Sequence, residues 1–190
     1  MVAYNAGAEA FNRRDYPAAR AQFEEARRLD PTLAPARSVL ARIYVQEKRY
    51  AEAASEAEEA LRLNPSDKRA LLARYEAYRG AGEQARADGA FAALREGDPQ
   101  GAARAFLDRG TALFERDNIA EACTYLEQAL ALDPALAKAH YRLGLCYLNQ
   151  GESAKAKGEL EAFLAAAPND PDAAAAREML ALLAGQKGKP

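Results

Sequence analysis

The chain has 190 residues, of which 49% are hydrophobic and 28% charged, a composition close to that of an average globular protein. This balance excludes a disordered or collagen-like chain. The formal net charge of −2 and the pI near 5.6 give no overall positive field, so neither nucleic acid nor an anionic membrane is an expected partner. Two cysteines and one histidine supply neither a disulfide framework nor a zinc site, and no metal or cofactor is expected.

Helix is the expected secondary structure throughout. Alanine, the strongest helix former, accounts for 48 of the residues, and apolar residues recur with the helical period. There is no run of about 18 apolar residues, so direct membrane insertion is not expected. The bias toward alanine and arginine suggests a bacterial, GC-rich genome. The compartment stays open between bacterial cytoplasm and periplasm, since a signal or anchor could have been removed.

Prolines divide the chain into units of about 34 residues. They are Pro31, Pro65, Pro99, Pro134 and Pro168, and an alanine stands twelve residues before each of them. Two apolar-periodic stretches fill each unit, with a short break between them, which predicts a helix hairpin. The expected hairpins span about 1–31, 32–65, 66–99, 100–134 and 135–168.

The third unit departs from the pattern. Four units carry a small residue in the first helix, namely Gly7, Ala41, Gly110 and Gly144, but the third carries Tyr75. Arg74 beside it takes a place that suits leucine, and the connection at 97–101 holds two glycines and the one extra residue of the array. A bend or hinge is predicted after this unit. The alternative is that Tyr75 turns outward and the array continues smoothly.

The last predicted element is a capping helix over about 170–184. Asp170 is expected to cap it, Pro171 to begin it, and Met179, Leu180 and Leu183 to form its apolar stripe. Leu182 widens the apolar surface toward the outside. Residues 185–190 are expected to be a flexible tail.

The sequence resembles the tetratricopeptide repeat (TPR) family, which has a 34-residue period. The residues that carry the resemblance are Ala19, Phe23, Ala26 and Pro31 in the first unit and Leu143, Gly144, Tyr147, Ala156, Leu160 and Pro168 in the fifth. The resemblance implies an all-α, right-handed superhelical solenoid of five helix hairpins plus the C-terminal capping helix. It also implies a single TPR domain over 1–184 and a non-catalytic scaffold for protein–protein interaction.

Residues that suggest chemistry are few. Cys123 and Cys146 are expected to be buried packing residues, and His140 stands where the family has tryptophan. The glycines are scattered, without the spacing of a phosphate-binding loop. No enzyme is predicted.

In this family the concave surface is lined mainly by the first helix of each hairpin, and that surface is the predicted peptide-binding groove. The resemblance assigns to it Tyr4, Phe11, Arg42, Arg69, Leu72, Arg79, Arg104, Leu107, Phe114, Lys138, Tyr141, Arg142, Leu145 and Asn149. Ala8 and Asn12 face the same way. The groove is locally basic, so the expected partner is a protein or peptide with acidic and apolar residues. Acids of the second helices, Glu56 among them, are expected to form an acidic outer face.

Some family members hold the C-terminal carboxylate of a chaperone in a clamp of lysine, asparagine and arginine. Lys138 and Arg142 match the last pair of that clamp, whereas Leu72, Glu76 and Asp108 do not match the earlier places. A partial carboxylate contact at Lys138 and Arg142 is therefore the expectation.

Two other functions remain open. The terminal faces, around Tyr4 and Phe11 at one end and Met179 and Leu182 at the other, could join copies of the chain into a homo-oligomer. Alternatively, the chain is a binding module cut from a larger bacterial assembly factor.

Overall fold

The computed structural model describes residues 1–185, and all regular structure within them is helical. The predicted tail lies, apart from Gly185, outside the described residues. The helices are α1 (Val2–Asn12), α2 (Tyr16–Leu29), α3 (Ala34–Gln46), α4 (Tyr50–Leu63), α5 (Lys68–Gly80), α6 (Gln84–Gly97), α7 (Pro99–Phe114), α8 (Ile119–Leu132), α9 (Ala137–Asn149), α10 (Ser153–Ala166) and α11 (Ala173–Gly185).

The chain divides into two compact units, Met1–Gly101 and Ala102–Pro190. A single domain over 1–184 was expected. The division falls in the first turn of α7, at the end of the glycine-containing connection for which the sequence predicts reduced stiffness. The bend itself stays a prediction, and each unit is described separately below.

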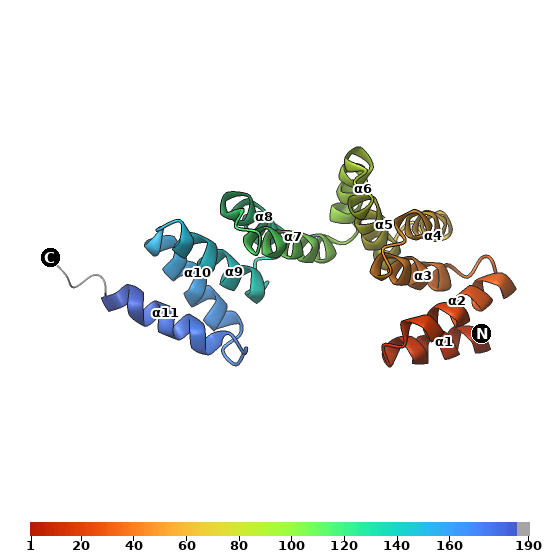
Figure 1. Ribbon diagram of the computed structural model, residues 1–190, viewed down its shortest axis with the longest axis horizontal. Coiled ribbons are helices and arrows are strands. Elements are labelled where there is room, and N and C mark those ends of the chain that lie inside the picture. Colours follow the sequence, from red (N-terminus) through yellow and green to blue (C-terminus); the bar gives the residue numbers. More distant parts are fainter. Residues whose placement is uncertain (186–190) are drawn as a thin grey trace. The chain divides into compact units, whose positions relative to one another are not determined.

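Unit 1 contains the hairpins α1/α2, α3/α4 and α5/α6, and α3 and α4 both also contact α5 (Figure 1). Two aspartates begin helices as caps. Asp15 accepts the backbone N–H of Ala18 at 3.1 Å, and Asp67 accepts those of Arg69 and Ala70 at 3.0 and 3.2 Å. These bonds satisfy N–H groups that have no partner within the helix, so they fix where α2 and α5 start.

Small residues let the helices of a hairpin approach closely. A Cβ atom added to Gly7 would lie 3.1 Å from the ring of Phe23, and Ala41 packs against the buried Ala57. In the third hairpin, two aromatic rings fill the corresponding contact between α5 and α6. Tyr75 is only 8% exposed and its ring lies 5.1 Å from that of Phe91, so the alternative in which Tyr75 turns outward is wrong.

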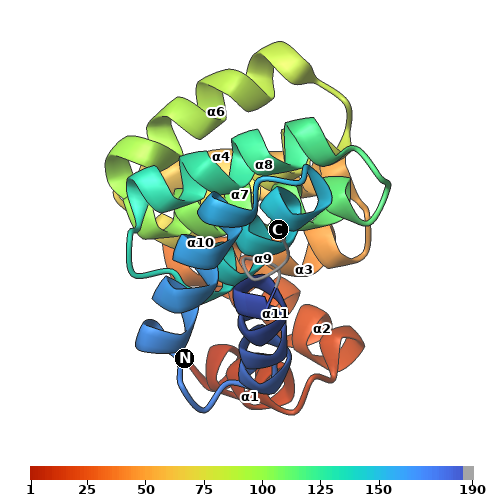
Figure 2. The same cartoon turned by 90° about the vertical axis from the view of Figure 1, so that its left-hand side faces the viewer.

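Unit 2 is built in the same way from α9/α10, with α8 packed on α9 and α11 on α10; Figure 2 shows the same helices from the side. Gly144 of α9 faces Leu160 of α10, to whose Cγ an added Cβ would lie 2.9 Å. The helix α11 begins at Ala173, later than the expected Pro171. Asp170 is therefore no helix cap; its carboxylate accepts the backbone N–H of Asp172 at 2.9 Å and contacts Lys138.

Glu56 differs from its expected place on an acidic outer face. It is 7% exposed and is bound by Arg27 and Arg37, the latter at 2.9 Å. A carboxylate so far removed from water needs such partners, because an unpaired buried charge is costly. Glu56 therefore stabilises the packing of α2 and α3 on α4.

Candidate functional site

A pocket of about 190 Å³ opens in unit 1 on the side formed by the first helices of its hairpins. Residues of α1, α2, α3 and α5 line it: Tyr4, Ala8, Phe11, Asn12, Phe23, Val39, Arg42 and Arg69. Six of these, all but Phe23 and Val39, are residues that the family resemblance assigns to the concave surface. We call this cavity the α1/α3/α5 pocket.

The apolar part of the pocket is held rigidly by ring contacts. Tyr4 meets Phe23 edge to face, with 5.4 Å between the ring centroids, and Phe11 meets Tyr16 in the same way at 5.5 Å. Such arrangements are favourable because the positive edge of one ring faces the negative face of the other. The partly buried Phe11 and Tyr4 thus present fixed apolar surface to the cavity.

Two cations complete the lining. The Arg42 guanidinium lies 5.6 Å from the centroid of the Phe11 ring, a cation–π contact that orients it toward the cavity. Arg42 and Arg69 are both exposed, and neither has an ion-pair partner among residues 1–185. The pocket therefore combines an aromatic wall with two guanidinium groups that are available to a carboxylate.

The other predicted groove residues of unit 1 lie outside this cavity lining. Leu72 is partly buried on α5. Arg79 is exposed and lies 5.9 Å from the centroid of the Tyr75 ring.

In unit 2 one of the predicted groove residues, Tyr141, lies in the core, and the three apolar ones among the others are partly buried. Tyr141 is 7% exposed and its ring centroid lies 5.0 Å from that of Phe163 in a tilted arrangement, while Leu107, Phe114 and Leu145 are partly buried against core clusters. Arg104 and Asn149 are exposed, and Arg142 is partly buried.

Lys138 already has carboxylates of its own chain. Its ammonium group lies 2.6 Å from Asp170 and 2.7 Å from Asp172, and these hydrogen bonds raise the pKa of Lys138 above its ordinary value. The lysine therefore ties α9 to the segment before α11. The ammonium group that was expected to meet a partner's carboxylate is occupied within the molecule.

Sequence reasoning missed Phe23 and Val39 as pocket residues. Both are buried, at 1% and 9% exposure, and they form part of the wall behind α1. Gly7 is the sequence feature that indicates the position of Phe23, because a glycine there allows the ring on α2 to come close to α1.

The two cysteines and the histidine, the side chains most suited to catalysis, are buried or hydrogen-bonded within the protein. Cys123 and Cys146 are buried free thiols, and burial raises the pKa of both. A raised pKa disfavours the reactive thiolate. His140 is partly buried between Glu159, at 2.7 Å from Nδ1, and the Pro134 carbonyl, at 2.9 Å from Nε2.

Within residues 1–185, no group of three or more histidine, cysteine or acidic side chains is placed to hold a metal ion. None of the helices in this part of the chain has the length and apolar character needed to cross a membrane.

Family models for the tetratricopeptide repeat match residues 4–68 and 38–102 in one case and residues 112–181 in the other. The chain belongs to the tetratricopeptide repeat family. The expected all-helical repeat fold is thereby confirmed, and TPR proteins are generally scaffolds for protein–protein interaction without catalytic activity. No curated protein is significantly similar to this TPR protein.

Solved structures with the same fold include other TPR proteins. MamA from Desulfovibrio magneticus RS-1 superposes with a TM-score of 0.61 at 16% identity, covering 90% of this chain and 96% of that one. YrrB, described as a TPR protein with an unusual peptide-binding site, gives 0.54 at 21% identity, covering 93% and 90%. TTC0263, a thermophilic TPR protein of Thermus thermophilus, gives 0.58 at 22%, covering 96% and 97%. At these identities the likeness shows the fold.

Proposed function

We propose that this TPR protein binds a peptide segment of a partner protein in the α1/α3/α5 pocket. The observation that carries the proposal is the convergence of Tyr4, Phe11, Arg42 and Arg69, predicted for binding from sequence, on one cavity. The peptide-binding site named for YrrB is consistent with such a use of the fold.

The size of the cavity favours an anchor side chain over a small-molecule substrate. Pockets for drug-sized ligands measure about 300–1,000 Å³, and this one measures about 190 Å³. One large apolar side chain of a bound segment would contact Tyr4 and Phe11 and lose its water there. Burying such a side chain contributes about 1.5–3 kcal/mol.

The two arginines give the acidic preference. A carboxylate near Arg42 or Arg69 accepts charge-assisted hydrogen bonds from a planar guanidinium, the geometry that suits it best. We therefore infer a segment with an aspartate or glutamate close to an aromatic or aliphatic anchor. Lys138 and Tyr141 are not part of the proposed site, because the first is paired and the second is buried.

The experiment is a nuclear magnetic resonance titration of the labelled protein with acidic peptides that carry one phenylalanine. Backbone signals of Ala8, Asn12 and Val39 are expected to move saturably. Arg42→Glu with Arg69→Glu should abolish the changes. Arg28→Glu with Arg62→Glu is the matched control, because both arginines are exposed but lie outside the pocket lining. Unchanged binding by the first pair would overturn the proposal.

A second candidate function is self-association. Val2 in α1 and Leu182 in α11 are large apolar side chains with 86% and 69% exposure. A second copy could cover them, as in stacked repeat arrays. Light scattering over a wide concentration range tests this: a mass that rises with concentration and returns to 20.5 kDa in Val2→Glu with Leu182→Glu would support it, and a constant monomer mass would exclude it.

A further inference from the structure

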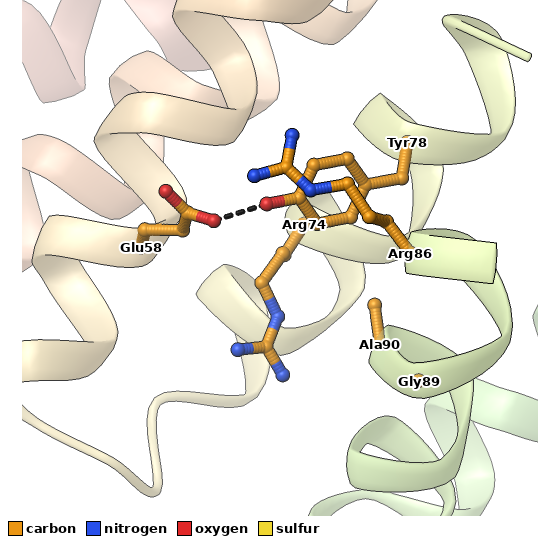
Figure 3. A pocket seen from close by; sticks show the side chains of 6 residues that line it. All are labelled: Glu58, Arg74, Tyr78, Arg86, Gly89 and Ala90. Carbon is orange, nitrogen blue, oxygen red and sulfur yellow. Dashed lines mark hydrogen bonds between the residues drawn. The ribbon is translucent and has the colours of Figure 1, made fainter. Parts of the chain in front are cut away.

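A second pocket lies in unit 1 between α4, α5 and α6 and has a volume of about 220 Å³ (Figure 3). It shares no residue with the α1/α3/α5 pocket. Its lining residues are Glu58, Arg74, Tyr78, Arg86, Gly89 and Ala90. We call it the Arg74 pocket.

Arg74 is the unexplained group in this pocket. Its Nε atom is buried and has no hydrogen-bond partner. Among residues 1–185 no carboxylate forms an ion pair with Arg74. A buried donor without an acceptor is costly, and more so when it belongs to a charged group.

The acids nearest to this pocket are already engaged. The Tyr78 hydroxyl donates a hydrogen bond to Glu58, drawn as a dashed line in Figure 3. Arg86 stacks 4.7 Å from the centroid of the Tyr78 ring and pairs with Glu83 at 2.8 Å. The charges of Arg74 and Arg86 thus equal those of Glu58 and Glu83. Of the two arginines, only Arg74 lacks a direct carboxylate partner among the described residues.

The next repeat shows which groups lie beside an arginine at the corresponding position. Arg109 stands 35 residues after Arg74, at the corresponding position of α7. It lies 3.8 Å from Glu121 of α8, and its guanidinium is 5.5 Å from the centroid of the Tyr125 ring. Arg109 therefore has a carboxylate and an aromatic face within its own hairpin.

Both of these partners are replaced around Arg74. The residues 35 positions before Glu121 and Tyr125 are Arg86 and Ala90, a like charge and a methyl group. Gly89, beside Ala90, would have nothing within 4 Å of an added Cβ, so the surface above it is open. The pocket occupies the place where the carboxylate and the ring stand in the next repeat.

We propose that the Arg74 pocket binds an acidic side chain of a partner protein, with an aromatic side chain of the same partner covering Gly89 and Ala90. The partner's carboxylate pairs with Arg74 as Glu121 pairs with Arg109, and the partner's ring takes the place that Tyr125 has beside Arg109. Because the local charge is balanced, long-range attraction contributes little. Selectivity comes from direct contact of the partner's carboxylate with Arg74. This site is separate from the proposed function, and either one can fail alone.

The test uses a 15-residue helical peptide of alanine and glutamine with one glutamate four residues before one tyrosine, the spacing of Glu121 and Tyr125. Acetyl and amide ends remove its terminal charges. The signal followed is the side-chain Nε–H resonance of Arg74 in the labelled protein, with that of Arg109 as an internal reference. A saturable movement of the Arg74 signal, and a stationary Arg109 signal, are the expected results.

Two controls define the contact. A peptide with glutamine in place of the glutamate is expected to bind at least tenfold more weakly. The double variant Arg86→Glu, Ala90→Tyr supplies the partners found in the next repeat, so it should lose peptide binding. Arg74→Leu is the second variant, because Leu40 and Leu143 are buried at the corresponding positions. This variant has no Arg74 signal, so binding is followed at the backbone amide of Gly89. The shift that the peptide causes there in the unaltered protein should be absent.

A stationary Arg74 signal at saturating peptide would overturn the proposal. So would equal binding of the glutamine peptide, or retention of binding by Arg74→Leu. Arg109→Leu is the matched control and is expected to bind the peptide as the unaltered protein does.

Discussion

The hydroxyl of Tyr44 on α3 donates a 2.8 Å hydrogen bond to Glu24, which lies twenty residues earlier on α2. The same bond joins Tyr78 to Glu58 and Tyr147 to Glu127, the latter at 2.7 Å. Each bond connects the second helix of one hairpin to the first helix of the next, so it sets the stacking of neighbouring repeats. The repeat pattern puts Ala92 and Leu113 at the remaining pair of positions, and neither side chain has a hydrogen-bonding group.

The stability that Tyr44 contributes should disappear at high pH. Burial, with a smaller contribution from Glu24, raises the pKa of Tyr44 to about 12. The folded state therefore holds the phenolic proton more tightly than the unfolded state, whose tyrosine titrates near 10. Stability from this group is present below pH 10 and falls as the pH rises toward 12.

Tyr44→Phe should lower the free energy of unfolding by about 1–2 kcal/mol at pH 7 and reduce the decline above pH 10. Urea denaturation at a series of pH values measures both. Tyr16→Phe is the control, since the Tyr16 hydroxyl has no hydrogen bond to the described residues. Equal effects of the two substitutions would contradict the prediction.

Two glycines in unit 2 should respond oppositely to alanine. Both lie inside helices, where alanine is favoured over glycine by about 1 kcal/mol. At Gly144 the new methyl group would meet Leu160 Cγ at 2.9 Å, whereas at Gly158 nothing lies within 4 Å. Gly144→Ala should destabilise the protein by about 1–3 kcal/mol. Gly158→Ala should raise the denaturation midpoint, and a rise for Gly144→Ala would show that the close approach is unimportant.

Tyr75 should be a stabilising residue despite its departure from the repeat pattern. Its ring is buried against Phe91, so Tyr75→Ala would leave a cavity and cost about 3–5 kcal/mol. Tyr75→Phe keeps the ring and should cost much less. Thermal denaturation of the two variants measures the difference, and similar melting temperatures would show that the Tyr75–Phe91 contact is not the source of stability.

The tie between α9 and the segment before α11 should be acid-sensitive. The hydrogen bond from Lys138, together with the Asp172 backbone N–H, lowers the pKa of Asp170. A lowered pKa gives stability that is present above the ordinary value near 4 and is lost as the pH falls through the folded value. The protection factors of the α11 amides, which compare exchange with the intrinsic rate at the same pH, should therefore fall below pH 4.

Lys138→Met should lower these protection factors already at pH 7 and remove most of their further decrease in acid. Lys157→Met is the control, because that lysine pairs with the exposed Glu161 at 3.5 Å, within its own helix α10. Exchange that is indifferent to Lys138→Met would contradict the role given to this ion pair.

Much of the fold can be predicted from the sequence because the same hairpin pattern recurs in five units. The 34-residue period of the prolines and the small residues at Gly7 and Gly144 predict hairpins, and the structure confirms helices there. In unit 1, the repeat register of the family placed Tyr4, Phe11, Arg42 and Arg69 on one face, and they share one cavity.

What the sequence could not supply is which charged and aromatic groups find partners inside the molecule. The pairing of Lys138 with Asp170 and Asp172 depends on where the chain passes before α11, and the period does not extend to that segment. Likewise Tyr75 breaks the small-residue pattern, and only the structure shows that its ring packs against Phe91, which stands at the place of Phe23 in the first hairpin. Among the described residues, Arg74 lacks the carboxylate that Arg109 has, and this difference lies in their three-dimensional surroundings.

We have proposed that Arg42 and Arg69 hold an acidic segment at the aromatic wall of the α1/α3/α5 pocket. A charge-reversal cycle tests it most directly, by isothermal titration of an acidic peptide with one phenylalanine and of the same peptide with lysines for its acids. If the two guanidinium groups bind the acids, Arg42→Glu with Arg69→Glu abolishes binding of the acidic peptide and creates binding of the lysine peptide. Equal affinity of the acidic peptide for both proteins would contradict it.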